Sequence, residues 1–209
     1  MSKREEMAPQ RLVVGISGAS GIIYGIRLLE AVKSQGIETH LVMSRTAEVT
    51  LAYETTLKVA DVHRLADVVH PIGDLGAAIA SGSFRTLGMV VAPCSVRSLA
   101  EIASGVTSTL LTRAADVTLK ERRTLVLMVR EAPLHLGHLR AMTQAAEIGA
   151  VIFPPVPAFY SRPQSLDEMV DHTVGRVLDQ LGLDVGLGPR WGENEAGGTA
   201  KQRPRRRDR

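Results

Sequence analysis

The sequence predicts an α/β protein with three layers, in which a Rossmann-like parallel sheet carries helices on both faces. Three observations support this prediction. Short apolar runs alternate with segments of helical periodicity along the whole chain. Residues 124–129 are almost all apolar, as expected for a parallel strand that is buried on both faces. Small and polar residues follow several predicted strands, at the edge of the sheet where such folds bind ligands.

Each element of this prediction has its own signal in the sequence. Apolar runs predict strands at residues 12–16, 39–43, 88–92, 124–129 and 150–153. Amphipathic periodicity predicts helices at residues 21–35, 45–53, 95–104, 109–119, 135–147 and 166–181. Gly36 fits a helix C-cap, Ser44 and Ser165 fit N-caps, and Pro93 is expected to break the third strand. The pattern over residues 61–69 is less clear than the others.

The composition is typical of a globular protein with one domain. Apolar residues make up 44% of the 209 residues and charged residues 22%, which allows a substantial core. We expect a flexible N-terminus at residues 1–10, a single α/β domain at 11–192, and a basic, disordered tail at 193–209.

The distribution of charge argues against a nucleic-acid partner. The formal net charge is +3, but six basic residues and one Asp between Lys201 and Arg209 give this segment a net charge of +5. The rest of the chain therefore carries −2. Because the positive charge lies in one short segment and not across the fold, we expect no nucleic-acid binding by the domain. The tail itself could still bind an anionic partner.

Cysteine content and the length of the apolar runs indicate a cytoplasmic protein outside the membrane. Cys94 is the single cysteine, so an intramolecular disulfide is excluded and a reducing compartment is favoured. Residues 1–10 lack the apolar segment of a signal peptide. No apolar run approaches the roughly 18–20 residues that span a bilayer.

The most informative segment is residues 11–25, where a strand runs through Ser17-Gly-Ala-Ser-Gly21 into a helix. Small residues allow a close backbone approach, and the N–H groups of a helix N-terminus bind anions such as phosphate. The segment is neither a GxGxxG fingerprint nor a Walker A sequence, so a tight turn without a ligand is the alternative. Ser44 and Pro93-Cys94-Ser95 follow two other strands in the same way, which favours a site for a mononucleotide phosphate and its flat ring.

Charged pairs near the later strands are further candidates. Arg130 and Glu131 directly follow the strand at 124–129. They could form a structural ion pair, or Arg130 could hold an anion while Glu131 acts as an acid or base. Arg113 and Lys120 lie seven residues apart on one helical face, a spacing that would suit a second phosphate.

Other reactive side chains are more simply explained as structural. Cys94 has no His beside it in sequence, so we expect it to pack and not to act as a nucleophile. His135 and His138 have a helical spacing but no obvious third ligand, so we expect no metal. Arg122 and Arg123 fit a solvated helix end.

Three residues toward the C-terminus could border a site. Tyr160 follows the Pro-rich segment 154–157, a stiff loop that could form one side of a binding site. Arg176 lies among apolar residues in the middle of a helix and could point to an anion. Trp191, the only Trp, could stack on a flat ring or pack at a subunit contact.

Over roughly residues 10–192, the chain resembles the flavin prenyltransferases, which are the UbiX family. The resemblance depends on the order and spacing of these motifs: Ser17-Gly-Ala-Ser-Gly21, the helix that ends at Glu54, Ser81-Gly-Ser83, Pro93-Cys-Ser95, Arg113-Ala-Ala-Asp116 with Leu119-Lys-Glu-Arg-Arg123, Arg130-Glu-Ala-Pro133, Pro157-Ala-Phe-Tyr160, Pro163-Gln-Ser165 and Pro189-Arg-Trp-Gly192. It implies the flavoprotein version of the predicted fold.

The resemblance implies a metal-independent enzyme that joins a dimethylallyl group from dimethylallyl phosphate to N5 and C6 of reduced FMN. The product, prenylated FMN, is the cofactor of UbiD-type decarboxylases, which would receive it. The resemblance also implies a homo-oligomer, a dodecamer, in which neighbouring subunits complete each site.

Roles for individual residues follow from the same resemblance. The FMN site would comprise Gly18, Ala19, Ser20, Ser44, Ser95, Val96, Arg97, Ser98, Arg130 and Trp191. The prenyl phosphate would be bound by Lys120, Arg130, Tyr160 and Arg176, and by Ser81 of a neighbouring subunit. The catalytic residues would be Ser20, Glu54, Lys120 and Glu131. Glu54 would lie near the prenyl group and the flavin, and Glu131 would handle protons as phosphate leaves and C6 loses hydrogen.

The chain departs from the family pattern at two positions, and two other functions are alternatives to prenyl transfer. Val129 stands where many members have Pro, and Arg97 stands where relatives often carry a small or neutral residue. An FMN-dependent cysteine decarboxylase of the related fold is one alternative, although the His and the Asn-containing loop that such enzymes use have no suitable counterpart here. A non-catalytic flavin carrier is the other, although a carrier would not need the candidate phosphate-binding residues.

Overall fold

A computed structural model describes residues 9–190 and 192 and confirms the predicted architecture. Six parallel strands form one sheet in the order β3-β2-β1-β4-β5-β6. The strands are β1 (Arg11–Ile16), β2 (Glu38–Met43), β3 (Val68–His70), β4 (Gly88–Cys94), β5 (Thr124–Val129) and β6 (Val151–Ile152). The chain reverses its direction of travel across the sheet between β1 and β4. Folds of this kind bind ligands beyond the carboxyl ends of the strands at that point.

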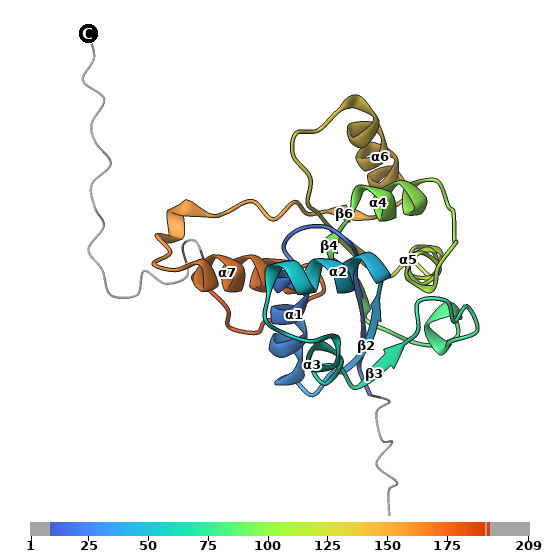
Figure 1. The fold of residues 1–209 in the computed structure, drawn as a ribbon, viewed down its shortest axis with the longest axis horizontal. Coiled ribbons are helices and arrows are strands. Elements are labelled where there is room, and N and C mark those ends of the chain that lie inside the picture. The colour runs from blue at the N-terminus through green and yellow to red at the C-terminus, as the bar shows by residue number, and fades with distance from the viewer. Residues whose placement is uncertain (1–8, 191, 193–209) are drawn as a thin grey trace, which may run out of the picture.

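Helices cover both faces of the sheet (Figure 1). They are α1 (Ile23–Lys33), α2 (Arg45–Glu54), α3 (Val59–His63), α4 (Val96–Ala103), α5 (Leu110–Lys120), α6 (Leu136–Glu147) and α7 (Leu166–Asp179), with short 3-10 turns η1 (Ala78–Ala80) and η2 (Phe159–Ser161). Alternate side chains of each strand enter different cores. Leu12 and Val14 pack with α1 and α7, whereas Val13 packs with α4, α5 and α6.

The helix starts at the carboxyl edge largely follow the sequence signals. Ser44 caps α2 by accepting a hydrogen bond from the Ala47 N–H at 3.1 Å. Ser165 caps α7 in the same way, so both predicted N-caps are confirmed. Helix α1 is shorter than predicted, because Gly21 precedes it with a φ of +97° and Ser34, not Gly36, is its C-cap.

One prediction about the strands is wrong, and one strand was not predicted. β3 and α3 lie in the region of residues 59–70, where the pattern was too short to predict a strand. Pro93 does not end β4, which continues to Cys94 with an irregular register after Val91. Proline has no N–H to donate, but its carbonyl still accepts. The Pro93 oxygen takes a hydrogen bond from the Ser17 N–H at 3.1 Å, and this bond holds the strand end in place.

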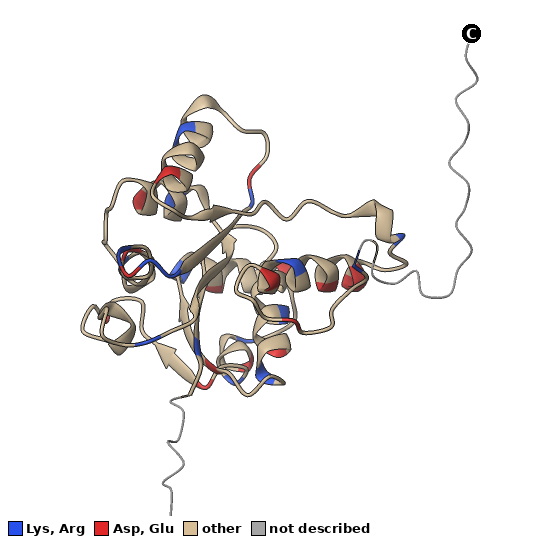
Figure 2. Ribbon diagram, turned by 180° about the vertical axis from the view of Figure 1, so that it is seen from behind, with Lys and Arg blue, Asp and Glu red and all other residues tan. Residues whose placement is uncertain are grey.

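Charged residues of both signs are intermixed over the described part of the fold (Figure 2). Within that part, no helix is long and apolar enough to cross a membrane. The basic segment between Lys201 and Arg209 and the N-terminal residues 1–8 lie outside the described residues.

The contact between α1 and β4 yields a first prediction. A Cβ added at Gly25 would lie 2.3 Å from the Ala92 oxygen and 2.8 Å from Ile16 Cδ1. Alanine favours a helix over glycine by about 1 kcal/mol, but overpacking typically costs about 1–3 kcal/mol. The atom met at 2.3 Å is a backbone oxygen, which cannot turn aside, so the upper end of this cost applies, about 3 kcal/mol. After the helix gain of about 1 kcal/mol, we expect Gly25→Ala to lower the free energy of unfolding by about 2 kcal/mol. Urea denaturation at a fixed protein concentration measures this change.

Gly73→Ala is the matched control, because a Cβ at Gly73 would meet nothing within 4 Å. We expect that variant to unfold at nearly the wild-type urea concentration. A Gly25→Ala protein as stable as the wild type would contradict the close packing of α1 on the sheet.

Candidate active site

A buried serine joins the carboxyl ends of β1 and β4. Ser17 is 1% exposed, and its Oγ donates to the Pro93 oxygen at 3.0 Å and accepts from the Ser95 N–H at 2.8 Å. Ser95 is also the N-cap of α4. The turn after β1 and the first residues of α4 are therefore held side by side. Sequence reasoning treated Ser17 as one small residue among several and missed this role.

The N-terminus of α2 lies on the other side of the same turn. The Ser44 N–H donates to the Ile16 oxygen at 2.9 Å. A Cβ at Gly18 would lie 2.4 Å from Thr46 Cβ and Oγ1, so only glycine allows the turn to approach α2 this closely. The structure thus brings together Gly18, Ser44 and Ser95, as the resemblance implied.

The backbone just before α1 has an anionic partner within the chain. The N–H groups of Gly21 and of the N-cap residue Ile22 bind the Glu54 carboxylate at the end of α2. Gly21 N–H donates to Glu54 Oε2 at 2.8 Å and Ile22 N–H at 2.9 Å. A carboxylate of the protein therefore lies beside the start of α1.

The first turns of α2 and α4 offer N–H groups instead. Within the described part of the chain, the N–H groups of the first two residues in each helix donate to no protein acceptor; these residues are Arg45, Thr46, Val96 and Arg97. The two helices follow β2 and β4, which flank β1 in the sheet. Two free helix N-termini therefore face the carboxyl edge on either side of the Gly18 turn, an arrangement that suits a phosphate.

Glu54 is held in its ionised form. Burial alone would raise the pKa of Glu54, but the hydrogen bonds from Ser20, Ile22 and Gly21 and the charge of Arg130 outweigh burial. The pKa of Glu54 therefore lies below its ordinary value of 4.5. Ser20 and Glu54, two predicted catalytic residues from different segments, are thus in direct contact.

Arg130 covers this cluster from the end of β5. A Cβ at Gly21 would lie 3.1 Å from Arg130 Cδ. Burial raises the pKa of Tyr24, and the nearby charge of Arg130 only partly opposes this rise. Arg130 and Glu131 form no ion pair with each other. The exposed Glu131 carboxylate instead accepts from the Ala132 N–H at 3.1 Å. The structural ion pair considered for these two residues is therefore absent.

The α4 residues of the predicted FMN site contribute mainly through the backbone. Ser95 Oγ accepts from the Ser98 N–H at 3.2 Å, and the two hydroxyls lie 3.2 Å apart. The Arg97 side chain is 76% exposed and pairs with Glu101 at 2.9 Å. Arg97 can therefore present its N–H to the edge while its charge faces solvent.

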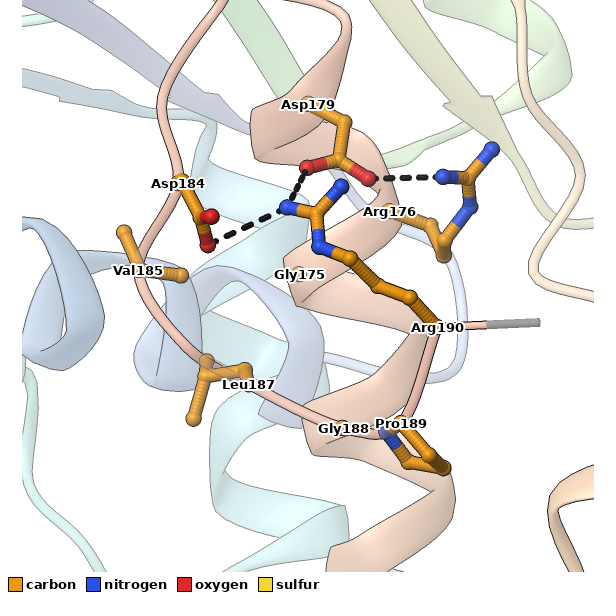
Figure 3. Close-up of a pocket in the computed structure, with 9 residues that line it drawn as sticks. All are labelled: Gly175, Arg176, Asp179, Asp184, Val185, Leu187, Gly188, Pro189 and Arg190. Atoms are coloured by element: carbon orange, nitrogen blue, oxygen red, sulfur yellow. Dashed lines mark hydrogen bonds and ion pairs between the residues drawn. The ribbon is translucent and has the colours of Figure 1, made fainter. Parts of the chain in front are cut away.

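A second group of predicted residues lies on α7 and the loop before it. Tyr160 Oη is 3.1 Å from Nε2 of the buried His172. Arg176, one turn further along α7, pairs with Asp179 at 2.7 Å, and Arg190 pairs with the other oxygen of Asp179 at 2.7 Å (Figure 3). This bridging carboxylate holds both arginines, and sequence reasoning did not find it.

A third group lies at the opposite edge of the sheet. Lys120 ends α5 only a few residues before β5 starts, so it lies at the amino end of that strand. A Cβ at Gly82 would be 2.6 Å from Lys120 Nζ, so the Ser81 loop contacts Lys120. Arg123 donates to the oxygens of Gly82 and Phe84, each at 2.7 Å. Arg123 is therefore not the solvated helix end that we expected, but an anchor for this loop.

The residues considered as nucleophile or metal ligands have structural surroundings. Burial raises the pKa of the Cys94 thiol to about 12, which makes it a poor nucleophile. His135 caps α6 through Nδ1, and its ring stacks on His138 with 3.6 Å between the centroids. Among the described residues, no three His, Cys, Asp or Glu side chains are grouped as metal ligands. Trp191 lies outside the described residues.

Comparison with known proteins agrees with this geometry. The model of the Flavoprotein family matches residues 1–178, which places the chain among the flavoproteins. A relative from Thauera aromatica, named flavin prenyltransferase UbiX, is 59% identical over 193 residues, which cover 92% of this chain and 100% of the relative. The chain therefore belongs to the flavin prenyltransferases of the UbiX family.

Two solved structures have the same fold and closely related sequences. The crystal structure of AnUbiX (PadA1) in complex with FMN and dimethylallyl pyrophosphate matches with a TM-score of 0.87 and 50% identity, covering 88% of this chain and 98% of that one. A dodecameric FMN-dependent UbiX-like decarboxylase from Escherichia coli O157:H7 matches with a TM-score of 0.85 and 48% identity, covering 87% and 99% of the two chains.

The contact between Glu54 and α1 predicts a stability that depends on pH. A carboxylate whose pKa is lowered by folding stabilises the protein above its unfolded-state pKa, and this contribution is lost as pH falls through the folded-state pKa. Capping side chains contribute about 1 kcal/mol. We expect Glu54→Gln to lower the free energy of unfolding by about 1 kcal/mol at pH 7, and we expect the difference from wild type to shrink below pH 4.5.

Urea denaturation at several pH values measures this difference. Glu147→Gln is the control, since the described structure gives the Glu147 carboxylate no hydrogen bond or ion pair. The role of Glu54 as a cap would be refuted if the two variants lost equal stability at pH 7, or if the loss at Glu54 did not change with pH.

Proposed function

We propose that this protein transfers a dimethylallyl group from dimethylallyl phosphate to N5 and C6 of reduced FMN. The prenylated FMN would then pass to a UbiD-type decarboxylase. One observation carries the proposal: the free N-termini of α2 and α4 lie at the same sheet edge as Ser20, Glu54 and Arg130. The UbiX relative at 59% identity and the related structure with FMN and dimethylallyl pyrophosphate support it.

The flavin phosphate fits the carboxyl edge of the sheet. The N–H groups at the start of α2 and α4 would donate to the phosphate, with the hydroxyls of Ser44, Ser95 and Ser98 beside them. Gly18 and Ala19 would let the flavin approach the backbone after β1. Bound FMN supplies the nucleophilic ring atoms, and Arg130 would hold an anionic group next to Glu54.

Cationic and hydroxyl groups would stabilise the phosphate as it leaves. A departing phosphate gains negative charge, so Tyr160, Arg176 and Lys120 would stabilise it more strongly in the transition state than in the ground state. An ionised Glu54 would face the positive charge that develops on the prenyl group. Glu131, exposed at the end of β5, would take up or deliver protons at the reacting centre.

A second copy of the chain would have to supply Lys120. Lys120 and Ser81 lie at the amino edge of the sheet, whereas Ser20 and Glu54 lie at the carboxyl edge of the same chain. We propose that both Ser81 and Lys120 enter the site of a neighbouring subunit. The dodecameric state of a related protein agrees with such an assembly.

The exposed apolar side chains near α6 fit a contact between subunits. Leu134, Leu136 and Leu139 are 40%, 58% and 47% exposed, which is unusual for three neighbouring leucines on a monomer surface. We propose a dodecamer formed in part through this face.

Two predictions from the sequence stay predictions. One is the division into a domain at 11–192 with a flexible N-terminus and tail, and the other is a cytoplasmic location.

The prenyl-transfer proposal has a direct test. Purified protein is incubated without oxygen with FMN, dithionite and dimethylallyl monophosphate, and the released flavin is analysed by mass spectrometry. We expect FMN to gain one C5H8 unit. Glu131→Gln should bind FMN as tightly as wild type but form product at least about 100-fold more slowly, because general acid–base catalysis contributes at least that much.

Unchanged product formation in Glu131→Gln would remove the proton role from Glu131. FMN that is bound but never modified by the wild type would contradict prenyl transfer itself. Loss of CO2 from cysteine-bearing substrates would then favour the cysteine decarboxylase, and its absence would favour the flavin carrier.

The shared site can be tested by complementation between subunits. Lys120→Ala and Glu131→Gln are each expected to be nearly inactive alone. If Lys120 acts in a neighbouring subunit, oligomers formed by coexpressing the two variants contain some sites with both wild-type residues. With random mixing, about a quarter of wild-type activity should return.

Two differently tagged copies of Lys120→Ala, coexpressed in the same way, provide the control and should stay inactive. If the mixed oligomers also stayed inactive although both chains were present, Lys120 and Glu131 would have to act from the same chain.

A further inference from the structure

We propose that Asp179 is a positioning residue: it holds the Arg176 guanidinium by one nitrogen and so presents the other edge of that group to the prenyl phosphate. The inference rests on the proposed function, in which Arg176 binds this phosphate. Asp179 belongs to none of the residues predicted for the site, and the chemistry described above does not use it.

Asp179 stands where local chemistry disfavours a carboxylate. It is the last residue of α7, and a negative side chain is unfavourable at the C-terminal end of a helix, where the helix dipole is also negative. Its side chain is only 16% exposed, so partial burial adds a further cost to its charge. The contacts of Asp179 with arginines must offset both effects.

The two oxygens of Asp179 bind different arginines (Figure 3). Oδ2 accepts from Arg176 Nη1 at 2.7 Å, and Oδ1 accepts from Arg190 Nη2 at 2.7 Å. The direction of both hydrogen bonds is fixed, because a guanidinium has only donors and a carboxylate has only acceptors. Arg190 therefore restrains the carboxylate that in turn restrains Arg176.

The segment that carries Arg190 is packed closely on α7. A Cβ added at Gly175 would lie 2.4 Å from the Leu187 oxygen, so only glycine allows the two backbones to approach in this way. Leu187 itself packs against the core that includes Val174. Arg190 thus reaches Asp179 from a segment whose position is set by the core.

One edge of the Arg176 guanidinium is left for an anion. Among the described residues, Nε and Nη2 of Arg176 donate to no protein acceptor. A guanidinium carries five N–H donors in a fixed plane, and two neighbouring nitrogens match two oxygens of a phosphate. With Nη1 bonded to Asp179, the Nε and Nη2 pair is the one that can bind a phosphate in this way.

The contact of Tyr160 with α7 indicates the side on which the phosphate would lie. Tyr160 Oη is 3.1 Å from His172 Nε2. His172 precedes Arg176 by four residues, so the two lie on the same side of the helix. A phosphate that binds Arg176 on this side would lie near Tyr160, as the proposed function requires.

Asp179 would affect phosphate binding in two ways that have opposite signs. Its negative charge repels a phosphate, so loss of the charge alone would strengthen binding. Its hydrogen bond orders Arg176 in advance, and loss of this order would weaken binding by about twofold to tenfold, the cost of immobilising one long side chain. Weaker binding without Asp179 therefore identifies the positioning role.

Calorimetric titration of dimethylallyl phosphate into the protein loaded with oxidised FMN measures binding alone, since the proposed transfer needs reduced FMN. We expect Asp179→Leu to raise the Kd for dimethylallyl phosphate about fivefold. Asp179→Asn keeps one accepting oxygen and should raise it less, and it decides the sign if Asp179→Leu does not fold. The Kd for FMN should stay unchanged in both variants.

Asp184→Asn is the matched control. It removes one negative charge from the same cluster and a contact with Arg190 at 3.1 Å, but none of the contacts of Asp184 within the described residues is with Arg176. We expect the Kd for dimethylallyl phosphate to stay at the wild-type value. An equal rise in Asp184→Asn would overturn the inference, as would an unchanged or lower Kd in the Asp179 variants.

A double variant shows whether Asp179 acts through Arg176. Because Arg176→Ala removes the group to be positioned, adding Asp179→Leu should weaken binding no further, and additive losses would overturn the inference. If these results came from a protein that transfers no prenyl group, only the proposed function would fail. If the wild type transferred the group but Asp179 did not affect binding, only the inference would fail. A wild type that binds no dimethylallyl phosphate would overturn both.

Discussion

The arrangement of the carboxyl edge depends on the buried hydroxyl of Ser17. It connects the end of β1 to the end of β4. The Ser17 hydroxyl donates to the Pro93 oxygen and accepts from the N–H of Ser95, the N-cap of α4. Because Ser17 is excluded from water, an unsatisfied partner at this position would be costly. These two hydrogen bonds therefore fix the turn at Gly18 and the N-terminus of α4 relative to each other before any ligand is present.

The sequence was informative where local chemistry decides the structure. Periodicity and caps such as Ser44 and Ser165 predicted most helices and strands, because these signals act within one turn. Contacts between distant segments were not readable in the same way. Nothing near Glu54 in sequence reveals that it binds the N–H groups of Gly21 and Ile22, and β3, with three residues, is too short for a recognisable pattern.

The same limit applies to the candidate site. The family motifs supplied the residues, but their spacing along the chain does not say which edge of the sheet each one reaches. Lys120 and the Ser81 loop lie at the amino edge because α5 runs back across the sheet before β5 begins. A helix that returns in this way always separates its C-terminus from the carboxyl edge. Residues from both edges can meet only if another copy of the chain is present.

Glu54 links the stability of the fold to the proposed reaction. Its carboxylate satisfies the start of α1, and the same hydrogen bonds keep its pKa low. A carboxyl group held in this way is a poor general acid at neutral pH, because it has no proton to give. Its charge is instead suited to stabilising a positive centre that forms nearby. A negative charge beside the start of α1 disfavours a second anion there, and the N–H groups at the start of α2 and α4 are better placed to donate to a phosphate.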